Sequence, residues 1–265
     1  MPLRLTFRDR LSAADRPLAG LWTCSGSPLA AEILAGAGMD WMLIDMEHSP
    51  LDLQTVLAQL QAIAAYDTTP VVRVPVGDVA TIKQVLDLGA QNILVPMIST
   101  AEEAEAVIRA VRYPPRGVRG VGSALARSAR WNRVDDYLTN TDAYVSVFVQ
   151  VETAQGVDNA EAIAAVDGVD GVFVGPSDLA ASMGLIGQQT HPDVVAAVRR
   201  AFDGIRAAGT PAGVNAFDPA AADAYVEAGA SFLLVGADVA MLARASEALA
   251  ARWIPASDNS TRASY

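Results

Sequence analysis

Two carboxylates follow two neighbouring apolar segments of the chain, each where a buried strand would end. Glu152 lies in Gln150-Val151-Glu152-Thr153, after the apolar run 144–149, and Asp178 lies in Gly175-Pro176-Ser177-Asp178, after the apolar run 169–174. Two carboxylates at the ends of neighbouring parallel strands suit a hard divalent cation and leave coordination positions for water or substrate. We therefore predict a metal site, with Mg²⁺ or Mn²⁺ favoured over Zn²⁺. Either carboxylate alone could simply cap the helix that follows.

A histidine and an aspartate lie close together after another apolar run, which begins at Trp41. Asp45 precedes His48 by three residues, so its carboxylate could reach the imidazole, fix its tautomer and raise its basicity. A pair of this kind can serve as a general base. The alternative is that His48 caps the helix that begins near Leu51.

One arginine and one lysine bear on how negative charge on a substrate would be stabilised. Arg73 lies in Val71-Val72-Arg73-Val74-Pro75, where its partner could be purely structural. At the end of a strand beside a metal, its guanidinium would suit a carboxylate, keto oxygen or enolate. The chain's only lysine, Lys83, lies inside the helical pattern 79–88, which argues against a Schiff-base mechanism.

The elements that must position these side chains alternate along the chain. Short apolar runs alternate with amphipathic segments, as in strand–helix units around a parallel sheet. We expect strands at 19–23, 41–47, 71–75, 92–98, 144–151, 169–175, 212–216 and 232–236, and helices at 53–64, 79–88, 101–112, 194–208 and 219–228. Eight such units favour a single-domain (β/α)₈ barrel over residues 1–253. The alternative is a doubly wound open sheet, but the first strand lacks the Gly-rich fingerprint of that fold.

In such a barrel the active site forms at the carboxyl ends of the strands. The polar residues expected there are Trp22, Thr23, Asp45, Glu47, His48, Arg73, Gln150, Glu152, Ser177, Asp178 and Asn215. The irregular stretch 113–140 is expected to be a lid or an interface segment. The tail 254–265 is expected to be disordered.

The composition limits the possible partners. A net charge of −11 and a pI near 4.6 argue against nucleic-acid and anionic-membrane partners. No apolar stretch approaches the ~18 residues that span a bilayer. A single cysteine, Cys24, and the lack of a signal peptide in residues 1–16 predict a cytoplasmic protein. Hydrophobic residues reach 52%, so we expect a subunit interface to cover some of them.

Four motifs carry a resemblance to a known family: Ile44-Asp45-Met46-Glu47-His48, Val72-Arg73-Val74-Pro75, Val151-Glu152-Thr153 and Gly175-Pro176-Ser177-Asp178-Leu179. Over residues 18–253 the chain is similar to the metal-dependent (class II) pyruvate aldolases, typified by 4-hydroxy-2-oxoheptanedioate aldolase and 2-keto-3-deoxy-L-rhamnonate aldolase. The resemblance implies a (β/α)₈ barrel of the phosphoenolpyruvate/pyruvate-domain type, with its last helix exchanged between subunits. It also implies a homohexamer arranged as a trimer of dimers.

The same resemblance implies a reversible aldol cleavage of a 4-hydroxy-2-oxo acid into pyruvate and an aldehyde. By match to the motifs, Glu152 and Asp178 would ligate Mg²⁺, Mn²⁺ or Co²⁺. Arg73 would bind the keto oxygen and stabilise the enolate, and His48, backed by Asp45, would move protons. The other substrate-binding residues implied are Trp22, Gln150, Gly175, Pro176, Ser177, Asn215 and Asp87, with Asp87 reaching the aldehyde pocket of a neighbouring subunit.

Two residues depart from the family pattern and leave the preferred aldehyde open. Ser177 stands where alanine is frequent, and Asn215 stands where an apolar residue is frequent. Two alternative functions remain. A CoA-thioester lyase of the malyl-CoA/citryl-CoA type would need a basic groove, for which the candidates are Arg116, Arg119, Arg127 and Arg130. A non-catalytic 2-oxo-acid-binding barrel would not need the Asp45–His48 pair.

Overall fold

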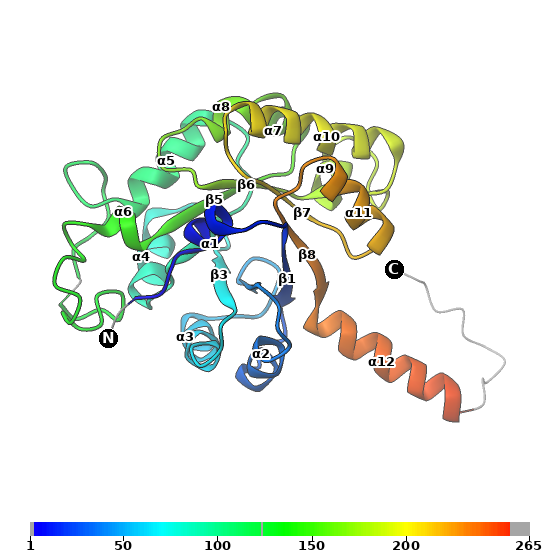
Figure 1. Cartoon of the computed structure of the whole chain (residues 1–265), viewed down its shortest axis with the longest axis horizontal. Helices are drawn as coiled ribbons and strands as arrows, with labels where there is room; N and C mark the ends of the chain where they lie inside the picture. The colour runs from blue at the N-terminus through cyan, green and yellow to red at the C-terminus, as the bar shows by residue number, and fades with distance from the viewer. Residues whose placement is uncertain (1–2, 123, 255–265) are drawn as a thin grey trace.

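Eight parallel strands close into one barrel, and helices surround it (Figure 1). The computed structural model describes residues 3–122 and 124–254. Neighbouring strands pair in chain order, and the last strand returns to the first. The strands are β1 (Leu18–Thr23), β2 (Trp41–Asp45), β3 (Thr69–Arg73), β4 (Asn92–Val95), β5 (Ser146–Val151), β6 (Gly171–Val174), β7 (Ala212–Asn215) and β8 (Phe232–Ala237). The predicted (β/α)₈ barrel is confirmed.

Helices precede the barrel and connect its strands on the outside. In the described residues they are α1 (Phe7–Ala13), α2 (Pro28–Ala35), α3 (Leu53–Ile63), α4 (Val79–Asp87), α5 (Ala101–Val111), α6 (Thr141–Tyr144), α7 (Ala154–Asp158), α8 (Ala160–Ala164), α9 (Pro176–Ser182), α10 (Pro192–Ala207), α11 (Pro219–Glu227) and α12 (Asp238–Trp253). Many begin at a side-chain cap; the Asp52 carboxylate, for example, accepts the Thr55 N–H at 2.7 Å.

Aromatic side chains close the amino-terminal end of the barrel. The ring of Phe7, from α1, lies 4.9 Å from Trp41 and 5.6 Å from Phe232, centroid to centroid. Gly213 makes room for Phe232, because a Cβ at that position would come within 2.2 Å of the ring. Aromatic side chains fill this end, whereas Arg73, Gln150 and Asn215 lie towards the carboxyl ends of their strands.

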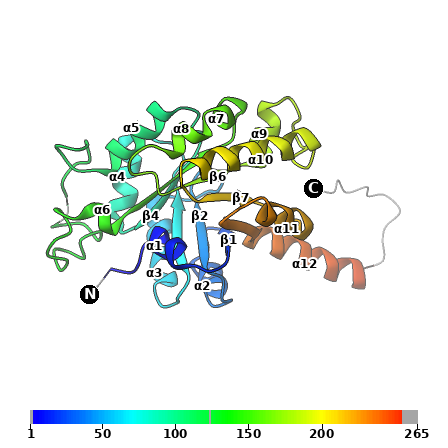
Figure 2. The ribbon, with the colours of Figure 1, turned by 45° about the horizontal axis from the view of Figure 1, so that its top comes forward.

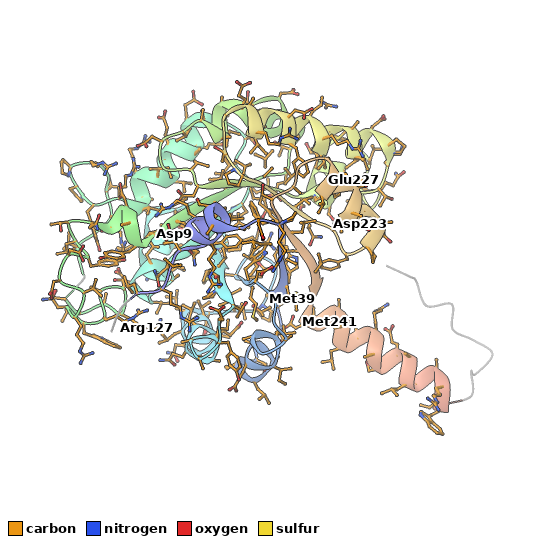
Figure 3. All side chains as sticks on the ribbon, viewed as in Figure 1. Asp9, Met39, Arg127, Asp223, Glu227 and Met241 are labelled. Carbon is orange, nitrogen blue, oxygen red and sulfur yellow. The ribbon has the colours of Figure 1, made fainter. Side chains whose placement is uncertain are left out.

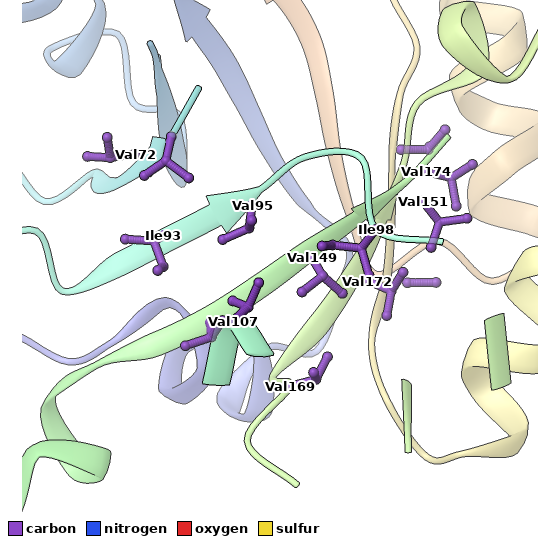
Figure 4. Packing of buried hydrophobic residues seen from close by; sticks show 14 of the residues in the cluster. Val72, Ile93, Val95, Ile98, Val107, Val149, Val151, Val169, Val172 and Val174 are labelled. Atoms are coloured by element: carbon purple, nitrogen blue, oxygen red, sulfur yellow. The ribbon is translucent and has the colours of Figure 1, made fainter. Parts of the chain in front are cut away.

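A second apolar layer joins the outside of the strands to the helices. Figure 4 shows Val72, Ile93, Val95 and Val149 from successive strands gathered with Val107 of α5. All five side chains are buried. This layer holds the strands rigidly, so residues at their carboxyl ends have fixed positions.

Several strands end earlier than the sequence predicted. β2 was expected to run to residue 47 but ends at Asp45, because that carboxylate accepts the backbone N–H groups of Glu47 at 3.0 Å and His48 at 3.4 Å. Glu47 and His48 therefore lie on a turn above the barrel. β4 ends at Val95 rather than residue 98, and Met97 follows in a left-handed conformation with φ of 60°.

The helix α12 extends away from the barrel in both views (Figures 1 and 2). Its base is fixed by Asp238, whose carboxylate accepts the backbone N–H groups of Cys24 at 2.8 Å and Ser25 at 3.0 Å. Further along, Leu242 is 71% exposed and Trp253 is 73% exposed. The tail predicted to be disordered lies outside the described residues apart from Ile254. No helix in the described part of the chain is long and apolar enough to cross a membrane.

Candidate active site

Arg73 lies at the centre of the polar residues at the carboxyl end of the barrel. Its side chain is 4% exposed, and both oxygens of Asp45 accept from it, from Nε and Nη2 at 2.9 Å each. The register of β2 and β3 pairs these two residues directly. The guanidinium carbon lies 4.4 Å from the ring centre of Trp22. Arg73 is therefore held on two sides by groups that only a folded barrel brings together.

The remaining nitrogen of Arg73 faces two further polar groups. Nη1 lies 2.9 Å from Oε2 of Glu47 and donates to Oε1 of Gln150 at 3.4 Å. Glu47 is only 14% exposed in its side chain, and burial raises its pKa. The sequence placed Glu47 near the site without a function. The sequence feature that could have indicated a role for Glu47 is its position between Asp45 and His48.

Glu152 is a buried carboxylate with hydrogen bonds but without a cation beside it. The backbone N–H of Met97 donates to Oε1 at 2.8 Å, and the side-chain amide of Gln150 donates to Oε2. Burial raises the pKa of Glu152 to about 7, and the negative charges of Asp178 and Glu47 raise it further. Such a group is ready to bind a cation, which would remove the cost of its charge.

Asp178 lies in the first turn of α9 and is exposed. The chain reaches it through Gly175, where a Cβ would lie 2.9 Å from Oε2 of Glu152 and 3.1 Å from Nε2 of Gln150. Only glycine lets the backbone pass so close to those side chains. Ser177 is exposed and Pro176 is buried. The structure thus brings Gly175 against Glu152 and Gln150, and Asp178 follows three residues later in the first turn of α9.

These carboxylates fit a divalent cation of the Mg²⁺ type. The negative charge of Asp178 raises the pKa of both Glu47 and Glu152, and the guanidinium of Arg73 is already shared with Asp45. No group of three or more potential His, Cys, Asp or Glu ligands occurs within the described residues. Two protein carboxylates are nevertheless sufficient for Mg²⁺, which commonly takes water and substrate oxygens as its other ligands.

The predicted pair between the His48 imidazole and the Asp45 carboxylate does not form. Arg73 donates to both oxygens of Asp45. The hydrogen bond between Asp45 and His48 comes from the backbone N–H of His48 and not from its imidazole. The imidazole is 62% exposed, and its Nε2 lies 3.9 Å from Oε2 of Glu47. Asp45 therefore shapes the turn that carries His48, and the acidic group nearest the imidazole is Glu47.

Two residues expected to bind substrate, Trp22 and Asn215, contact each other. The indole Nε1–H of Trp22 donates to Oδ1 of Asn215 at 2.8 Å. Trp22 is buried and Asn215 is half-buried. Because the indole also lies against Arg73, Asn215 is connected to that guanidinium through one ring.

Asp87 lies at the other end of the barrel, where α4 ends before β4. Its carboxylate accepts from Nη2 of the fully buried Arg119 at 2.8 Å. It does not join the site of its own barrel. The arginines considered for a CoA groove are also divided, since Arg116 pairs with Asp142 at 2.6 Å. Arg127 instead donates to the last turn of α4.

The sequence matches a family model described as HpcH/HpaI aldolase/citrate lyase over residues 18–245. The chain belongs to this family. The 4-hydroxy-2-oxo-heptane-1,7-dioate aldolase of Salmonella dublin is 51% identical over 251 residues, which are 95% of each protein. The predicted family is thus confirmed, and with it the expectation of an aldolase, an enzyme that acts on carbon–carbon bonds.

Solved structures agree with the fold. A crystal structure of an HpcH/HpaI aldolase/citrate lyase family protein from Burkholderia cenocepacia J2315 superimposes with a TM-score of 0.87 at 46% identity, covering 91% of this chain and 96% of that one. The citrate lyase beta subunit of M. tuberculosis, solved with oxaloacetate and magnesium, has a TM-score of 0.52 at 19% identity, covering 86% of this chain and 93% of that one. The second likeness establishes the fold alone.

Proposed function

We propose that this member of the HpcH/HpaI family catalyses the reversible aldol cleavage of a 4-hydroxy-2-oxo acid into pyruvate and an aldehyde. The C3–C4 bond breaks, the 4-hydroxyl loses its proton, and negative charge moves onto the 2-keto oxygen. The observation that carries the proposal is the buried Arg73 guanidinium, joined through Gln150 to the buried Glu152. A fixed cation in a site that excludes water stabilises such developing charge.

The cofactor in this proposal is a divalent metal, Mg²⁺, Mn²⁺ or Co²⁺, held by Glu152 and Asp178. When bound, it supplies a Lewis acid for the 2-oxo group, worth several kcal/mol at the developing negative charge. The chemistry of the donor set supports it, because Glu152 and Asp178 supply two carboxylates and burial raises the pKa of Glu152 to about 7. The backbone of residues 175–178 would then hold the substrate carboxylate.

Arg73 and Gln150 orient the 2-oxo group. Nη1 of Arg73 does not contact Asp45 but lies 2.9 Å from Oε2 of Glu47, and it would donate to the keto oxygen in place of that contact. Gln150 bridges Arg73 and Glu152 and keeps the two at a constant separation. The charge that forms on the oxygen is thus met by a donor that need not move.

His48 moves the proton of the 4-hydroxyl. Its imidazole stands exposed on the turn above the barrel, where a bound substrate would extend toward solvent. Asp45 acts as a positioning residue, because it holds both the turn and Arg73. Glu47 lies beside the imidazole, with its Oε2 3.9 Å from Nε2 of His48.

The aldehyde portion would contact Trp22, Ser177 and Asn215. Asn215 uses its oxygen for the indole, so its amide N–H groups remain to donate to an oxygen of the aldehyde. Asp87 would reach the corresponding pocket of a neighbouring subunit. Both assignments leave the physiological aldehyde to be measured.

A homohexamer built as a trimer of dimers, with α12 exchanged between subunits, accompanies this proposal. The exposed apolar side chains of α12, among them Leu242 and Trp253, support a contact with a second copy. Leu29 and Ile33 of α2 are also exposed and lie beside the base of α12. Mass photometry of the full chain checks the number of subunits. The cytoplasmic location expected from the sequence stays a prediction.

The decisive test of the function uses the acid for which the 51% identical relative is named. Purified protein with Mg²⁺ or Mn²⁺ should convert 4-hydroxy-2-oxoheptane-1,7-dioate into pyruvate and 4-oxobutanoate, measured by coupled pyruvate reduction. CoA thioesters of similar length should not be cleaved. Turnover of the thioester without turnover of the free acid would contradict the proposal.

A further inference from the structure

A cavity at the amino-terminal end of the barrel collects positive charge that the proposed reaction does not use. Its volume is about 430 Å³, within the usual range for small-molecule sites. Arg4, Arg10, Arg127 and Arg130 line it. These are four of the nineteen lysine and arginine residues of a chain with a net charge of −11. None of the described residues that line the cavity is an aspartate or glutamate.

This cavity is separate from the candidate active site. Thr69 and Pro70, which line it, begin β3, whereas Arg73 ends that strand. At ~3.3 Å per residue, the strand separates the two ends by about 13 Å. Figure 3 places Arg127 on the side of the molecule away from α12. A ligand in the cavity therefore cannot touch Arg73 or Glu152 of the same barrel.

Arg127 and Arg130 lie side by side without a carboxylate. Their Nη1 atoms would be 2.7 and 3.0 Å from a Cβ placed on Gly89, so the two guanidinium groups are neighbours. In the described part of the chain they donate only to backbone oxygens: Arg127 to Leu88 at 2.9 Å, and Arg130 to Arg127 at 2.7 Å. Burial lowers the pKa of both groups, and for Arg127 the neighbouring charge adds to the effect.

The backbone that carries Arg130 adopts a conformation that is unfavourable for residues other than glycine. Arg130 has a φ of 50°, and Trp131 and Asn132 after it have φ of 54° and 63°. Such left-handed conformations are costly for residues other than glycine and cluster at ligand sites. Among the other arginines of the loop, Arg116 and Arg119 have carboxylate partners, and the guanidinium of Arg133 lies over the ring of Trp131, 5.6 Å from its centroid. An anion is what the remaining pair lacks.

We propose that this cavity binds a small organic anion at a second site, remote from the catalytic one. Its carboxylate or phosphate would accept hydrogen bonds from Arg127 and Arg130, which suit both groups. Its apolar part would cover Leu5, which is 66% exposed, and would lie against Leu60. The inference is independent of the proposed reaction.

Calorimetric titration tests this site with two probes, inorganic phosphate and hexanoate, on the metal-free full chain. Both should bind saturably, and Arg73→Lys, which alters the catalytic mouth, should bind both probes like the wild type. The double variant Arg127→Gln/Arg130→Gln should weaken binding about tenfold or more, because each lost charge-assisted bond removes a large contribution. Arg116→Gln is the matched control and should bind like the wild type, since Arg116 lies on the same loop but is paired with Asp142.

Either of two results overturns the proposal: neither probe binds the wild type, or the double variant binds as well as the wild type. Loss of binding in Arg73→Lys would move the binding to the catalytic mouth and would also contradict the proposal. If the double variant does not fold, wild-type crystals soaked in bromide give a second test. An anomalous peak between the two Nη1 atoms supports the site, and its absence contradicts it. If neither probe binds the wild type and the double variant dissociates the oligomer, Arg127 and Arg130 form a subunit contact instead of an anion site.

Discussion

Both oxygens of Asp45 accept hydrogen bonds from Arg73, at 2.9 Å each, across neighbouring strands β2 and β3. This bidentate contact decides the arrangement of the catalytic mouth. It turns Nη1 of Arg73 toward Gln150 and Glu47, and it leaves the imidazole of His48 without the aspartate expected from the sequence.

Replacing Arg73 by lysine should separate charge from geometry. Lysine keeps a positive charge beside Asp45 but cannot form the bidentate contact or stack on Trp22 in the same way. We expect Arg73→Lys to fold and to lose about 100-fold or more in kcat/KM, the scale of removing one donor from a developing anion. Arg73→Ala should instead cost about 3–5 kcal/mol of folding stability, because it leaves the buried Asp45 without its cationic partner. An unchanged rate in Arg73→Lys would remove the bidentate geometry from the mechanism.

Glu152 should make the stability of the metal-free protein depend on pH. Its pKa in the folded protein is about 7 against 4.5 for the free side chain, so the folded state keeps a proton that the unfolded chain has released. Stability from this group is full below pH 4.5 and falls as the pH rises towards 7, by about 3 kcal/mol. Urea unfolding of wild type and Glu152→Gln across this range measures the difference. Equal slopes for the two proteins would show that Glu152 does not carry the effect.

His48 should matter for catalysis and little for stability. Because the imidazole is 62% exposed, His48→Ala should unfold within about 0.5 kcal/mol of the wild type. Its kcat for aldol cleavage should fall about 100-fold or more. The chain's other histidine, His191, is the matched control. It caps α10 by accepting the Asp193 N–H, so His191→Ala should lose about 1 kcal/mol of stability. Its aldol-cleavage activity should equal that of the wild type.

Gly175 should tolerate no side chain. A Cβ there would meet Oε2 of Glu152 at 2.9 Å and Nε2 of Gln150 at 3.1 Å, so Gly175→Ala must displace one of them. We expect Mn²⁺ affinity, measured by electron paramagnetic resonance, to fall about tenfold or more, the scale seen when groups supporting metal ligands are disturbed. Gly36→Ala is the control, because its nearest contacts are an ordinary 3.4 Å or more. Equal Mn²⁺ affinity in both variants would argue against Glu152 as a ligand.

The barrel and most of the residues at its carboxyl end could be predicted from the sequence. The spacing of apolar residues and the residues that end each strand or helix are local features of the chain. Apolar runs mark the strands, and residues directly after them, such as Glu152 and Asp178, must lie at one end of a parallel barrel. The partner of Asp45 could not be predicted from the residues near it in the sequence. His48 is nearer along the chain, but Arg73 is directly opposite in the register of two strands.

The arginines of the loop 113–140 illustrate a second limit. In the sequence they form one cluster, yet Arg116 and Arg119 are neutralised by carboxylates brought from elsewhere. Arg127, Arg130 and Arg133 have no salt-bridge partner among the described residues, and Arg127 and Arg130 line a cavity at the far end of the barrel from Arg73. Spacing along the chain cannot reveal which charges the fold will pair.

The most direct test of the central proposal is the exchange of the pyruvate methyl protons for deuterium in D₂O, followed by proton NMR. Enzyme stripped with a chelator should show no exchange, and Mg²⁺ or Mn²⁺ should restore it, because the 2-oxo acid loses a proton only where its negative charge is stabilised at Arg73 and the cation held by Glu152 and Asp178. Full exchange in the presence of chelator, or no exchange with any divalent metal, would contradict the proposed mechanism.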